Sequence, residues 1–272
     1  MNGTPIAVVL ARGLGTRMRR QAEGIALADD QSRLADTGLK ALIPVGRPFL
    51  DYVLSGLADA GIRDVCLVIG PEHDVVRDYY GQPGILSRVT LSFAVQDVPR
   101  GTADAVVAAG DMVGDREFLV LNGDNYAPLE ALRALAALDG PGLVAFGREA
   151  MIRESNVEAD RVRQFAVVRV GSDDTLQDIV EKPDEATLAA FGDDIYLSMN
   201  YWRFDRRVLD ACRRVTPSPR GELEIPDGVR LACRDGGVSF RVIRMHAGVL
   251  DLSSRSDISA VAARLAGVQV KL

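Results

Sequence analysis

Short apolar runs rich in β-branched residues alternate with helical patterns through the first 145 residues of the chain. The apolar runs predict strands over 6–10, 65–69, 91–95, 118–122 and 143–146. Apolar residues at helical spacing predict helices over 49–60, 74–80, 102–109 and 129–138. This alternation predicts an α/β fold, a Rossmann-like α/β/α sandwich with a mostly parallel central sheet.

The second half of the chain is richer in predicted strands. We predict a hairpin from strands over 165–170 and 176–180, and further strands over 196–204 and 238–243. Helices are predicted over 208–215 and 258–265. Pro226 is placed to open another helix, because proline is tolerated in a first turn. No internal repeat is visible. We therefore expect one domain over 1–272, whose halves, about 1–145 and 146–272, share one sheet.

Residues 18–39 interrupt the pattern because they are polar, rich in charge and poorly periodic. Long segments of this kind are usually functional or disordered. Two interpretations stay open for this segment, a lid over a binding site or a plain surface insertion.

Composition and charge exclude several classes of protein. Hydrophobic residues make up 47% of the 272 residues, which suffices for a large core. The formal net charge is −6 and no basic run is clustered, so we expect no nucleic-acid partner. No apolar run approaches a membrane span and no signal-peptide pattern is visible. We therefore expect a cytoplasmic protein without a membrane partner.

Cysteine and histidine usage argues against metal sites built on those residues. The widely spaced Cys66, Cys212 and Cys233 form no CxxC pair and predict no disulfide framework. His73 and His246 are the only histidines, so a His-rich zinc site is not expected.

A glycine-rich loop follows the first predicted strand. Its residues are Leu10, Ala11, Arg12, Gly13, Leu14, Gly15, Thr16 and Arg17. Glycines let a backbone approach phosphate, successive N–H groups bind anions, and an arginine fork suits phosphate oxygens. A dinucleotide-binding loop would need a third glycine where Met18 stands, which counts against a nicotinamide oxidoreductase. A structural turn is the alternative.

Two further segments contain candidate ligand contacts. Lys40 stands before an apolar segment and after the glycine loop. Gln96 ends a predicted strand, where its amide can read a base edge with one donor and one acceptor. Gly101 and Thr102 begin the next predicted helix, where a backbone can pack closely on a ligand. Taken alone, Lys40 and Gln96 would each be interpreted as solvated polar residues.

Acidic residues near predicted strand ends are candidates for a metal site. Asp124 and Asn125 follow the strand predicted over 118–122, and α/β sheets bind ligands at the carboxyl ends of strands. Magnesium prefers one or two carboxylates plus substrate phosphates, so Asp124 and Asp251 are candidate ligands. The alternatives are a helix-capping Asp124 and a turn Asp251. Glu181 and Lys182 can bind a hydroxylated phosphate ligand, or form a surface pair of little energetic value.

Six motifs in this order resemble one family. They are LARGLGTRM, LKALIPV, VQ…RGTADA, LNGDN, VEKP and GVLD. Together they are similar to the sugar-1-phosphate nucleotidylyltransferases, or sugar-nucleotide pyrophosphorylases, over about residues 6–262. The hexose-1-phosphate thymidylyltransferase and uridylyltransferase types are the most similar. The resemblance implies a nucleotidyltransferase, GT-A-like sandwich with a nucleotide-binding first half and a sugar-phosphate-binding second half.

The resemblance also implies roles for the matching residues. The implied nucleotide contacts are Leu10, Ala11, Arg12, Gly13, Gly15, Thr16, Gln96, Gly101 and Thr102. The implied catalytic residues are Arg17, Lys40, Asp124 and Lys182. The implied sugar-phosphate contacts are Asn125, Ala166, Glu181, Lys182 and Asn200, and the implied Mg²⁺ ligands are Asp124 and Asp251. A nucleoside triphosphate and a sugar 1-phosphate are the implied partners, and a homo-oligomer is compatible with them.

The implied reaction needs no strong base. A phosphate monoester has a second pKa of about 6 and is mostly a dianion at neutral pH. Direct in-line attack of its oxygen on the α-phosphorus would release pyrophosphate, with catalysis by positioning and charge neutralisation.

Several residues depart from the family pattern and keep alternatives open. Arg12 stands where relatives usually have glycine or alanine, and Leu39 where they have proline or serine. Ala166 and Asn200 replace glycines beside the sugar, and Val249 replaces a tryptophan. These departures leave room for a non-catalytic regulatory protein that binds sugar nucleotides. The nucleobase is also open, because Gln96 together with 123–125 and 220–225 is similar to relatives that use dTTP or UTP, while 101–104 is similar to relatives that use ATP or GTP.

Overall fold

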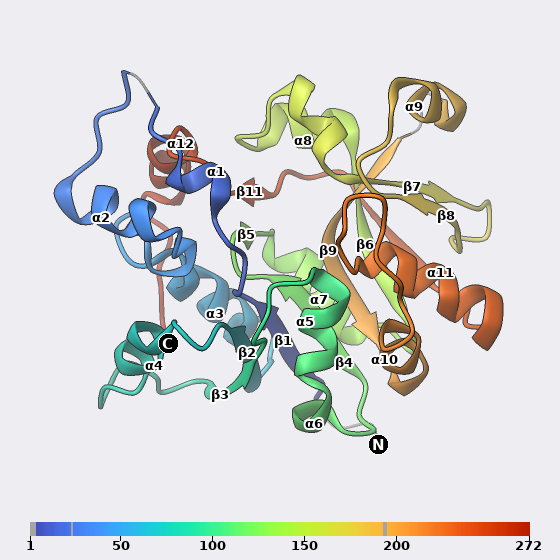
Figure 1. Cartoon of the computed structure of the whole chain (residues 1–272), viewed down its shortest axis with the longest axis horizontal. Coiled ribbons are helices and arrows are strands. Elements are labelled where there is room, and N and C mark those ends of the chain that lie inside the picture. Colours follow the sequence, from blue (N-terminus) through green and yellow to red (C-terminus); the bar gives the residue numbers. More distant parts are fainter. Residues whose placement is uncertain (1–3, 23, 193–194) are drawn as a thin grey trace.

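A computed structural model describes residues 4–22, 24–192 and 195–272. Helices cover both faces of a central sheet, so the chain folds as three layers (Figure 1). The nine strands of the sheet are β1 Ile6–Leu10, β2 Asp64–Ile69, β3 Thr90–Val95, β4 Phe118–Asn122, β6 Gly142–Gly147, β7 Ala166–Val170, β8 Leu176–Val180, β9 Tyr196–Phe204 and β10 Arg241–Met245. The strands β5 Asn125–Tyr126 and β11 Leu250–Asp251 form a separate two-stranded sheet.

The strand order along the main sheet is β10-β6-β9-β4-β1-β2-β3. Strand β7 also pairs with β9, and β8 pairs with β7. Strand β1 pairs in parallel with β2 and β4, and β6 pairs in parallel with β10. Only β9 runs antiparallel to its neighbours β4 and β6 on this path. The predicted α/β sandwich with a mostly parallel sheet is therefore confirmed, and strands from both halves of the chain share the sheet.

The described helices alternate with the strands through most of the first half. In the second half, α10 and α11 follow one another between β9 and β10. The α-helices are α1 Thr16–Arg19, α2 Asp29–Thr37, α3 Phe49–Asp59, α4 Asp74–Tyr80, α5 Thr102–Ala108, α6 Gly110–Val113, α7 Leu129–Ala137, α8 Arg148–Glu154, α9 Glu185–Phe191, α10 Arg206–Cys212, α11 Ile225–Gly236 and α12 Asp257–Leu265. Two 3₁₀ helices are η1 Lys40–Leu42 and η2 Ala159–Gln164.

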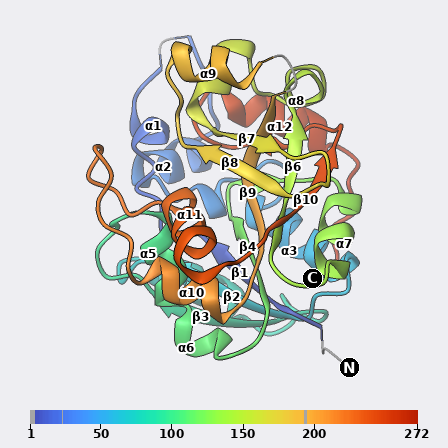
Figure 2. The same ribbon diagram turned by 90° about the vertical axis from the view of Figure 1, so that its right-hand side faces the viewer.

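Two hydrophobic clusters hold the layers together, one on each face of the sheet. Alternate residues of a strand point to opposite faces, so Val9 and Leu119 join α3, α7 and α12 in one cluster. Val8 and Val120 join α5, α10 and α11 in the other. Helices α5, α10 and α11 contact one another on that second face (Figure 1 and Figure 2). The buried β-branched runs therefore form a sheet covered on both sides.

Most element boundaries follow the predictions, with two informative shifts. The helix predicted over 208–215 begins at Arg206, because the Asp205 side chain caps it by accepting from the backbone N–H groups of Arg207 and Val208. The strand predicted over 238–243 is instead Arg241–Met245, and the buried Val238 lies before it. Pro226 lies in the first turn of α11, as predicted.

The segment over 18–39 contains a helix that its weak periodicity did not predict, α2. Its end is held by Arg19, which donates from Nε to the Thr37 carbonyl at 3.0 Å. The buried Arg255, from the turn before α12, forms an ion pair with Asp36 and donates to the Arg20 carbonyl at 3.1 Å. The ties from Arg255 come from a residue far away in the sequence, and both interpretations of the segment, a lid and a plain surface insertion, stay predictions.

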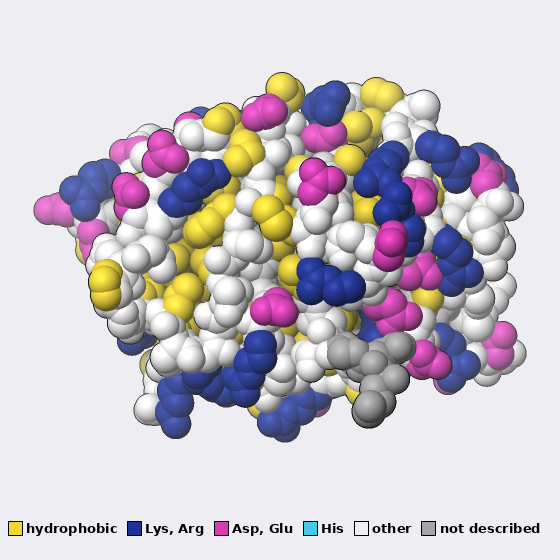
Figure 3. Space-filling view, turned by 90° about the horizontal axis from the view of Figure 1, so that it is seen from below, with side chains coloured by type: hydrophobic (Ala, Val, Ile, Leu, Met, Phe, Trp, Pro, Cys, Tyr) yellow, Lys and Arg dark blue, Asp and Glu magenta, His cyan; other side chains and the backbone are white. Residues whose placement is uncertain are grey.

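One face of the molecule carries charges of both signs. Figure 3 shows Lys and Arg side chains interspersed with Asp and Glu, and apolar side chains between them. Within the part of the chain that the structure describes, no helix is both long and apolar enough to cross a membrane.

Candidate active site

The glycine loop leaves β1 at its carboxyl end and turns tightly before α1. Gly15 adopts a left-handed conformation with φ of 60°, and a Cβ on it would lie 2.4 Å from the Gly38 carbonyl oxygen. No larger residue fits between these backbones, so Gly15 brings the end of the 18–39 segment against the loop. Lys40 follows directly and is thereby brought to the mouth of the loop.

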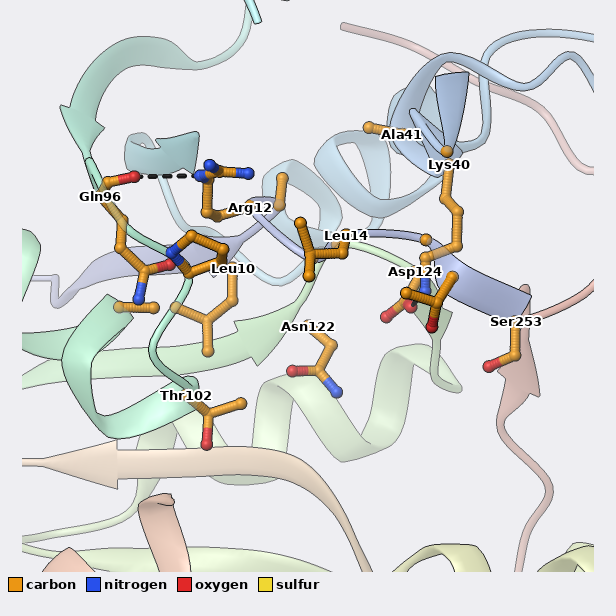
Figure 4. Close-up of a pocket in the computed structure, with 18 of the residues that line it drawn as sticks. Leu10, Arg12, Leu14, Lys40, Ala41, Gln96, Thr102, Asn122, Asp124 and Ser253 are labelled. Atoms are coloured by element: carbon orange, nitrogen blue, oxygen red, sulfur yellow. Dashed lines mark hydrogen bonds and ion pairs between the residues drawn. The ribbon is translucent and has the colours of Figure 1, made fainter. Parts of the chain in front are cut away.

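A cleft of about 360 Å³ lies between this loop and the carboxyl ends of β1, β3 and β4 (Figure 4). It contains all of the residues predicted to bind nucleotide and three of the predicted catalytic residues. They are Leu10, Ala11, Arg12, Gly13, Gly15, Thr16, Arg17, Lys40, Gln96, Gly101, Thr102 and Asp124. The structure therefore brings together segments that lie more than 100 residues apart.

A second cavity, of about 190 Å³, adjoins the cleft and shares Arg17, Thr102 and Asp124 with it. It contains the remaining predicted residues, which are Asn125, Ala166, Glu181, Lys182, Asn200 and Asp251. Two adjoining cavities with common charged residues can hold two ligands with their reactive groups in contact.

Basic side chains line both cavities. The Lys40 ammonium donates to Asp124 Oδ2, and Figure 4 shows Lys40 directed toward Asp124. Arg17 donates to Gln164 Oε1 and, at 3.2 Å, to Ser253 Oγ. Lys182 is exposed at the rim of the second cavity. Arg17 therefore lines both cavities, Lys40 the cleft and Lys182 the second cavity, and such cations suit ligands with several phosphate oxygens.

Asp124 and Asp251 lie close together although they are far apart in the sequence. Asp251 lies 126 positions after Asn125, the residue that follows Asp124. The antiparallel pairing of β5 with β11 places Asp251 opposite Asn125, and Leu252 N–H donates to the Asp124 carbonyl at 2.9 Å. Burial, and then the charge of Asp124, raise the pKa of the Asp251 carboxyl. This like-charge proximity is the arrangement that a divalent cation relieves.

The two carboxylates fit magnesium better than they fit a metal with a protein-only ligand set. In the described residues, no group of three or more His, Cys, Asp and Glu side chains could hold a metal ion. Magnesium usually binds through one or two carboxylates and completes its coordination with water and phosphate oxygens. The pair of Asp124 and Asp251 matches that donor set.

Asp251 is held from both sides. Asn125 Nδ2 donates to its Oδ1 at 2.9 Å, and Arg161 Nη2 donates to its Oδ2 at 2.5 Å. The other arm of Arg161 donates to Asp257 Oδ1 at 2.7 Å. Asp257 in turn accepts from the backbone N–H groups of Ser253 and Ser254 at 3.0 Å and 2.7 Å. The orientation of the Asp251 carboxylate is therefore determined by charged and amide donors.

The amide of Gln96 differs from the sequence-based prediction. Its Nε2 donates to the Gly101 carbonyl at 3.1 Å and to Asp104 Oδ2 at 2.8 Å. An amide nitrogen has two N–H groups, so both are used inside the protein. The prediction of one donor and one acceptor for a base was therefore wrong for this conformation, because only the acceptor oxygen is left.

Arg12 lies beside Gln96, and its side chain is buried. Its Nε donates to the Gln96 carbonyl at 3.0 Å (Figure 4), and its Nη1 lies 2.7 Å from Glu72 Oε1. A Cβ on Gly70 would clash with this guanidinium at 2.6 Å. The arginine that departs from the family pattern thus ties the loop to the ends of β2 and β3.

The second cavity has an acidic wall. Glu181, Glu222 and Glu224 line it, and Glu224 forms an ion pair with Arg220. Burial, and then the charge of Glu224, raise the pKa of Glu181 to about 7. Carboxylates in this position can accept hydrogen bonds from ligand hydroxyls.

The other departures from the family pattern have distinct surroundings. Ala166 is buried and lines the second cavity, as does Asn200. Val249 and Leu39 are buried in the hydrophobic core. Val249 lines neither of the two cavities.

Sequence reasoning missed several polar residues of the site. Ser253 lines both cavities, while Arg161 comes from η2. The 3₁₀ segment has no periodic apolar pattern that would have marked it. Asn122 ends β4 two residues before Asp124, and its place at a strand end was the one available signal for it.

The fold and the site together define a nucleotide-binding α/β protein. It has a glycine loop, two neighbouring carboxylates and a second cavity whose carboxylates can accept hydrogen bonds from hydroxyl groups. The Nucleotidyl transferase family model matches residues 6–266. The chain belongs to that family.

The matches to individual relatives cover different shares of those relatives. A low-salt glycan biosynthesis nucleotidyltransferase of Haloferax volcanii is 29% identical over 233 residues, and the match covers 84% of this chain but 57% of that relative. A glucose-1-phosphate thymidylyltransferase of Neisseria gonorrhoeae is 27% identical over 266 residues, which cover 96% of this chain and 83% of that relative.

A solved structure supports the fold. UDP-glucose pyrophosphorylase complexed with UDP-glucose has a TM-score of 0.76 at 15% identity, with 99% of this chain and 100% of that one covered. At this identity, the similarity concerns the fold.

Proposed function

We propose that the chain transfers a nucleotidyl group from a nucleoside triphosphate to a sugar 1-phosphate and releases pyrophosphate. The observation that carries the proposal is the convergence of Asp124 and Asp251 at the junction of two cavities, beside the glycine loop. The names of the thymidylyltransferase relative and of the UDP-glucose structure support a pyrimidine triphosphate and a hexose 1-phosphate. The proposed compartment is the cytoplasm.

In this proposal, the glycine loop binds the triphosphate through backbone N–H groups, and Arg17 and Lys40 neutralise its charge. The sugar 1-phosphate binds in the second cavity, where Lys182 faces its phosphate and Glu181 accepts from its hydroxyls. Asp124 and Asp251 would hold a magnesium ion, which when bound supplies positive charge to the phosphates.

The sugar phosphate is already a nucleophile. It is mostly a dianion at neutral pH, so its oxygen can attack the α-phosphorus while the bond to pyrophosphate breaks. The role of the side chains is to hold two anions together in line and to neutralise them. This accounts for a site with three cations and no activated Ser or Cys nucleophile among the proposed residues.

A matrix of five nucleoside triphosphates against several sugar 1-phosphates, assayed by pyrophosphate release, tests the proposal. We expect at least one pair to give magnesium-dependent turnover, with dTTP or UTP preferred. A folded protein that binds triphosphate but releases no pyrophosphate with any sugar 1-phosphate would contradict catalysis. That outcome would favour a regulatory protein that binds sugar nucleotides.

A further inference from the structure

The backbone of Asn200 is unusual. Among the described residues other than glycine, only Asp174, Lys182 and Asn200 have positive φ, and the value for Asn200 is 58°. Two of these three, Lys182 and Asn200, line the second cavity. Asparagine tolerates this left-handed conformation better than most residues, and such conformations concentrate at ligand sites.

A buried tryptophan determines which half of the Asn200 amide points where. Trp202 Nε1 donates to Asn200 Oδ1 at 3.1 Å, and Trp202 is fully buried. An indole nitrogen can only donate, so it requires the amide oxygen on its side. The amide nitrogen of Asn200 must therefore point the other way.

A relay of amides continues from Asn200 to the proposed metal ligand. Asn200 Nδ2 donates to Asn122 Oδ1 at 3.4 Å, and Asn122 Nδ2 donates to Asn125 Oδ1 at 3.0 Å. Asn125 Nδ2 donates to Asp251 Oδ1 at 2.9 Å. A carboxylate only accepts, so Trp202 at one end and Asp251 at the other impose the same direction on all three amides.

This direction leaves donors for a ligand in the second cavity. Asn125 uses both of its N–H groups, since it also donates to the Asp124 carbonyl at 3.3 Å. Asn200 uses one in the relay, and its half-buried side chain lines the cavity. The second N–H of Asn200 is thus a donor held in one orientation, whereas Glu181 and Glu222 offer acceptors from the same lining.

We propose that Asn200 determines acceptor specificity by donating from Nδ2 to a hydroxyl oxygen of the sugar 1-phosphate. Trp202 acts as the positioning residue that keeps the amide nitrogen toward the cavity. A sugar hydroxyl can accept a hydrogen bond from Asn200 and donate one to a carboxylate at the same time. The amide donor alone, or the carboxylates alone, would leave either the donor or the acceptor capacity of the hydroxyl unused. This inference rests on the proposed function, because the ligand of the cavity is the sugar 1-phosphate of that reaction.

Two substitutions at Asn200 test the inference. Asn200→Asp keeps the shape and the acceptor for Trp202 but removes the donor, and Asn200→Gly removes the side chain while permitting positive φ. We expect both to raise KM for the preferred sugar 1-phosphate about tenfold or more, because the hydrogen bond from Asn200 to the sugar hydroxyl is lost. KM for the triphosphate should stay within about twofold. We also expect Asn200→Gly to narrow the kcat/KM difference between the preferred and other sugar 1-phosphates.

Asp174→Gly is the matched control, since Asp174 shares the positive φ but lies outside both cavities. It should change neither KM. Unchanged sugar KM in both Asn200 variants, or an equal rise in both KM values, would overturn the inference while the wild-type activity upheld the proposed function. A wild-type protein inactive with every sugar 1-phosphate would overturn both.

Discussion

Gln96 Nε2 lies 2.8 Å from Asp104 Oδ2, and this contact determines which half of the Gln96 amide faces the nucleotide cleft. Arg100 pairs with the other oxygen of Asp104 at 2.8 Å. Because Gly101 accepts the second N–H of Gln96, only the Gln96 oxygen is left for a ligand. In the proposed function, a nucleobase must therefore meet Gln96 with an N–H group.

We expect Asp104→Leu to weaken discrimination among nucleoside triphosphates, because the Gln96 amide can then rotate and present a donor. A hydrogen-bonded base contact discriminates by about 1–3 kcal/mol, so the kcat/KM ratio of UTP, whose base has an N–H at N3, to CTP, whose base has none there, should fall about tenfold. Asp104→Asn keeps an acceptor for Gln96 and should preserve the ratio. Steady-state kinetics with ATP, GTP, CTP, UTP and dTTP would measure it. Identical ratios in the three proteins would remove Asp104 from base selection.

Asp124→Asn should abolish most turnover without unfolding the protein. The substitution removes a charge that Lys40 contacts and that the proposed magnesium site needs. Loss of one such interaction costs about 10²–10³-fold in kcat. Pyrophosphate release against magnesium concentration would measure the loss, and thermal unfolding would check the fold. The exposed Asp139→Asn is the charge-matched control. Near-wild-type magnesium-dependent activity of Asp124→Asn would exclude Asp124 as a metal ligand.

Arg161→Leu should destabilise the fold as well as the site. Arg161 joins Asp251 and Asp257, and all three side chains are at most 16% exposed. Removing the cation leaves buried carboxylates uncompensated, which typically costs about 3–5 kcal/mol. Urea unfolding would measure the loss. Arg163→Leu, two residues on, breaks an exposed pair with Glu185 and should cost about 1 kcal/mol or less. Similar losses in both variants would contradict the compensating role of Arg161.

The raised pKa of Glu181 predicts a pH dependence of stability. Glu181 ionises near pH 7 in the folded protein, against an ordinary value of 4.5. Between these values the folded state holds a proton that the unfolded state has released, so stability falls as pH rises through this window. We expect Glu181→Gln, which stays neutral, to lack that part of the fall. Urea unfolding from about pH 4.5 to about pH 8 would measure it.

The control for this prediction is Glu185→Gln, which removes an exposed carboxylate from the neighbouring helix α9. Its profile should parallel that of the wild-type protein. A Glu181→Gln profile that also parallels the wild type would show that burial does not shift the ionisation of Glu181 in solution.

The sequence by itself determined the layered fold and much of the site, because both depend on local patterns. Buried strands such as 6–10 and 118–122 are marked by their apolar runs, and ligands of α/β sheets bind at strand ends. The glycine loop and Asp124 could therefore be predicted as neighbours, whereas Lys40 taken alone would have been interpreted as a solvated residue. Asp251 could be included only through the motif order of the family, since a short turn segment has no pattern of its own.

Tertiary structure alone decided the directions of the polar groups. The orientation of Gln96 depends on Asp104, and that of Asn200 depends on Trp202 and on a relay that ends at Asp251. Hydrogen-bond direction arises from partners that meet only in the folded chain, so no spacing in the sequence encodes it. For the same reason, the ties from Arg255 to the 18–39 segment and from Arg161 to Asp251 could not be predicted from the sequence.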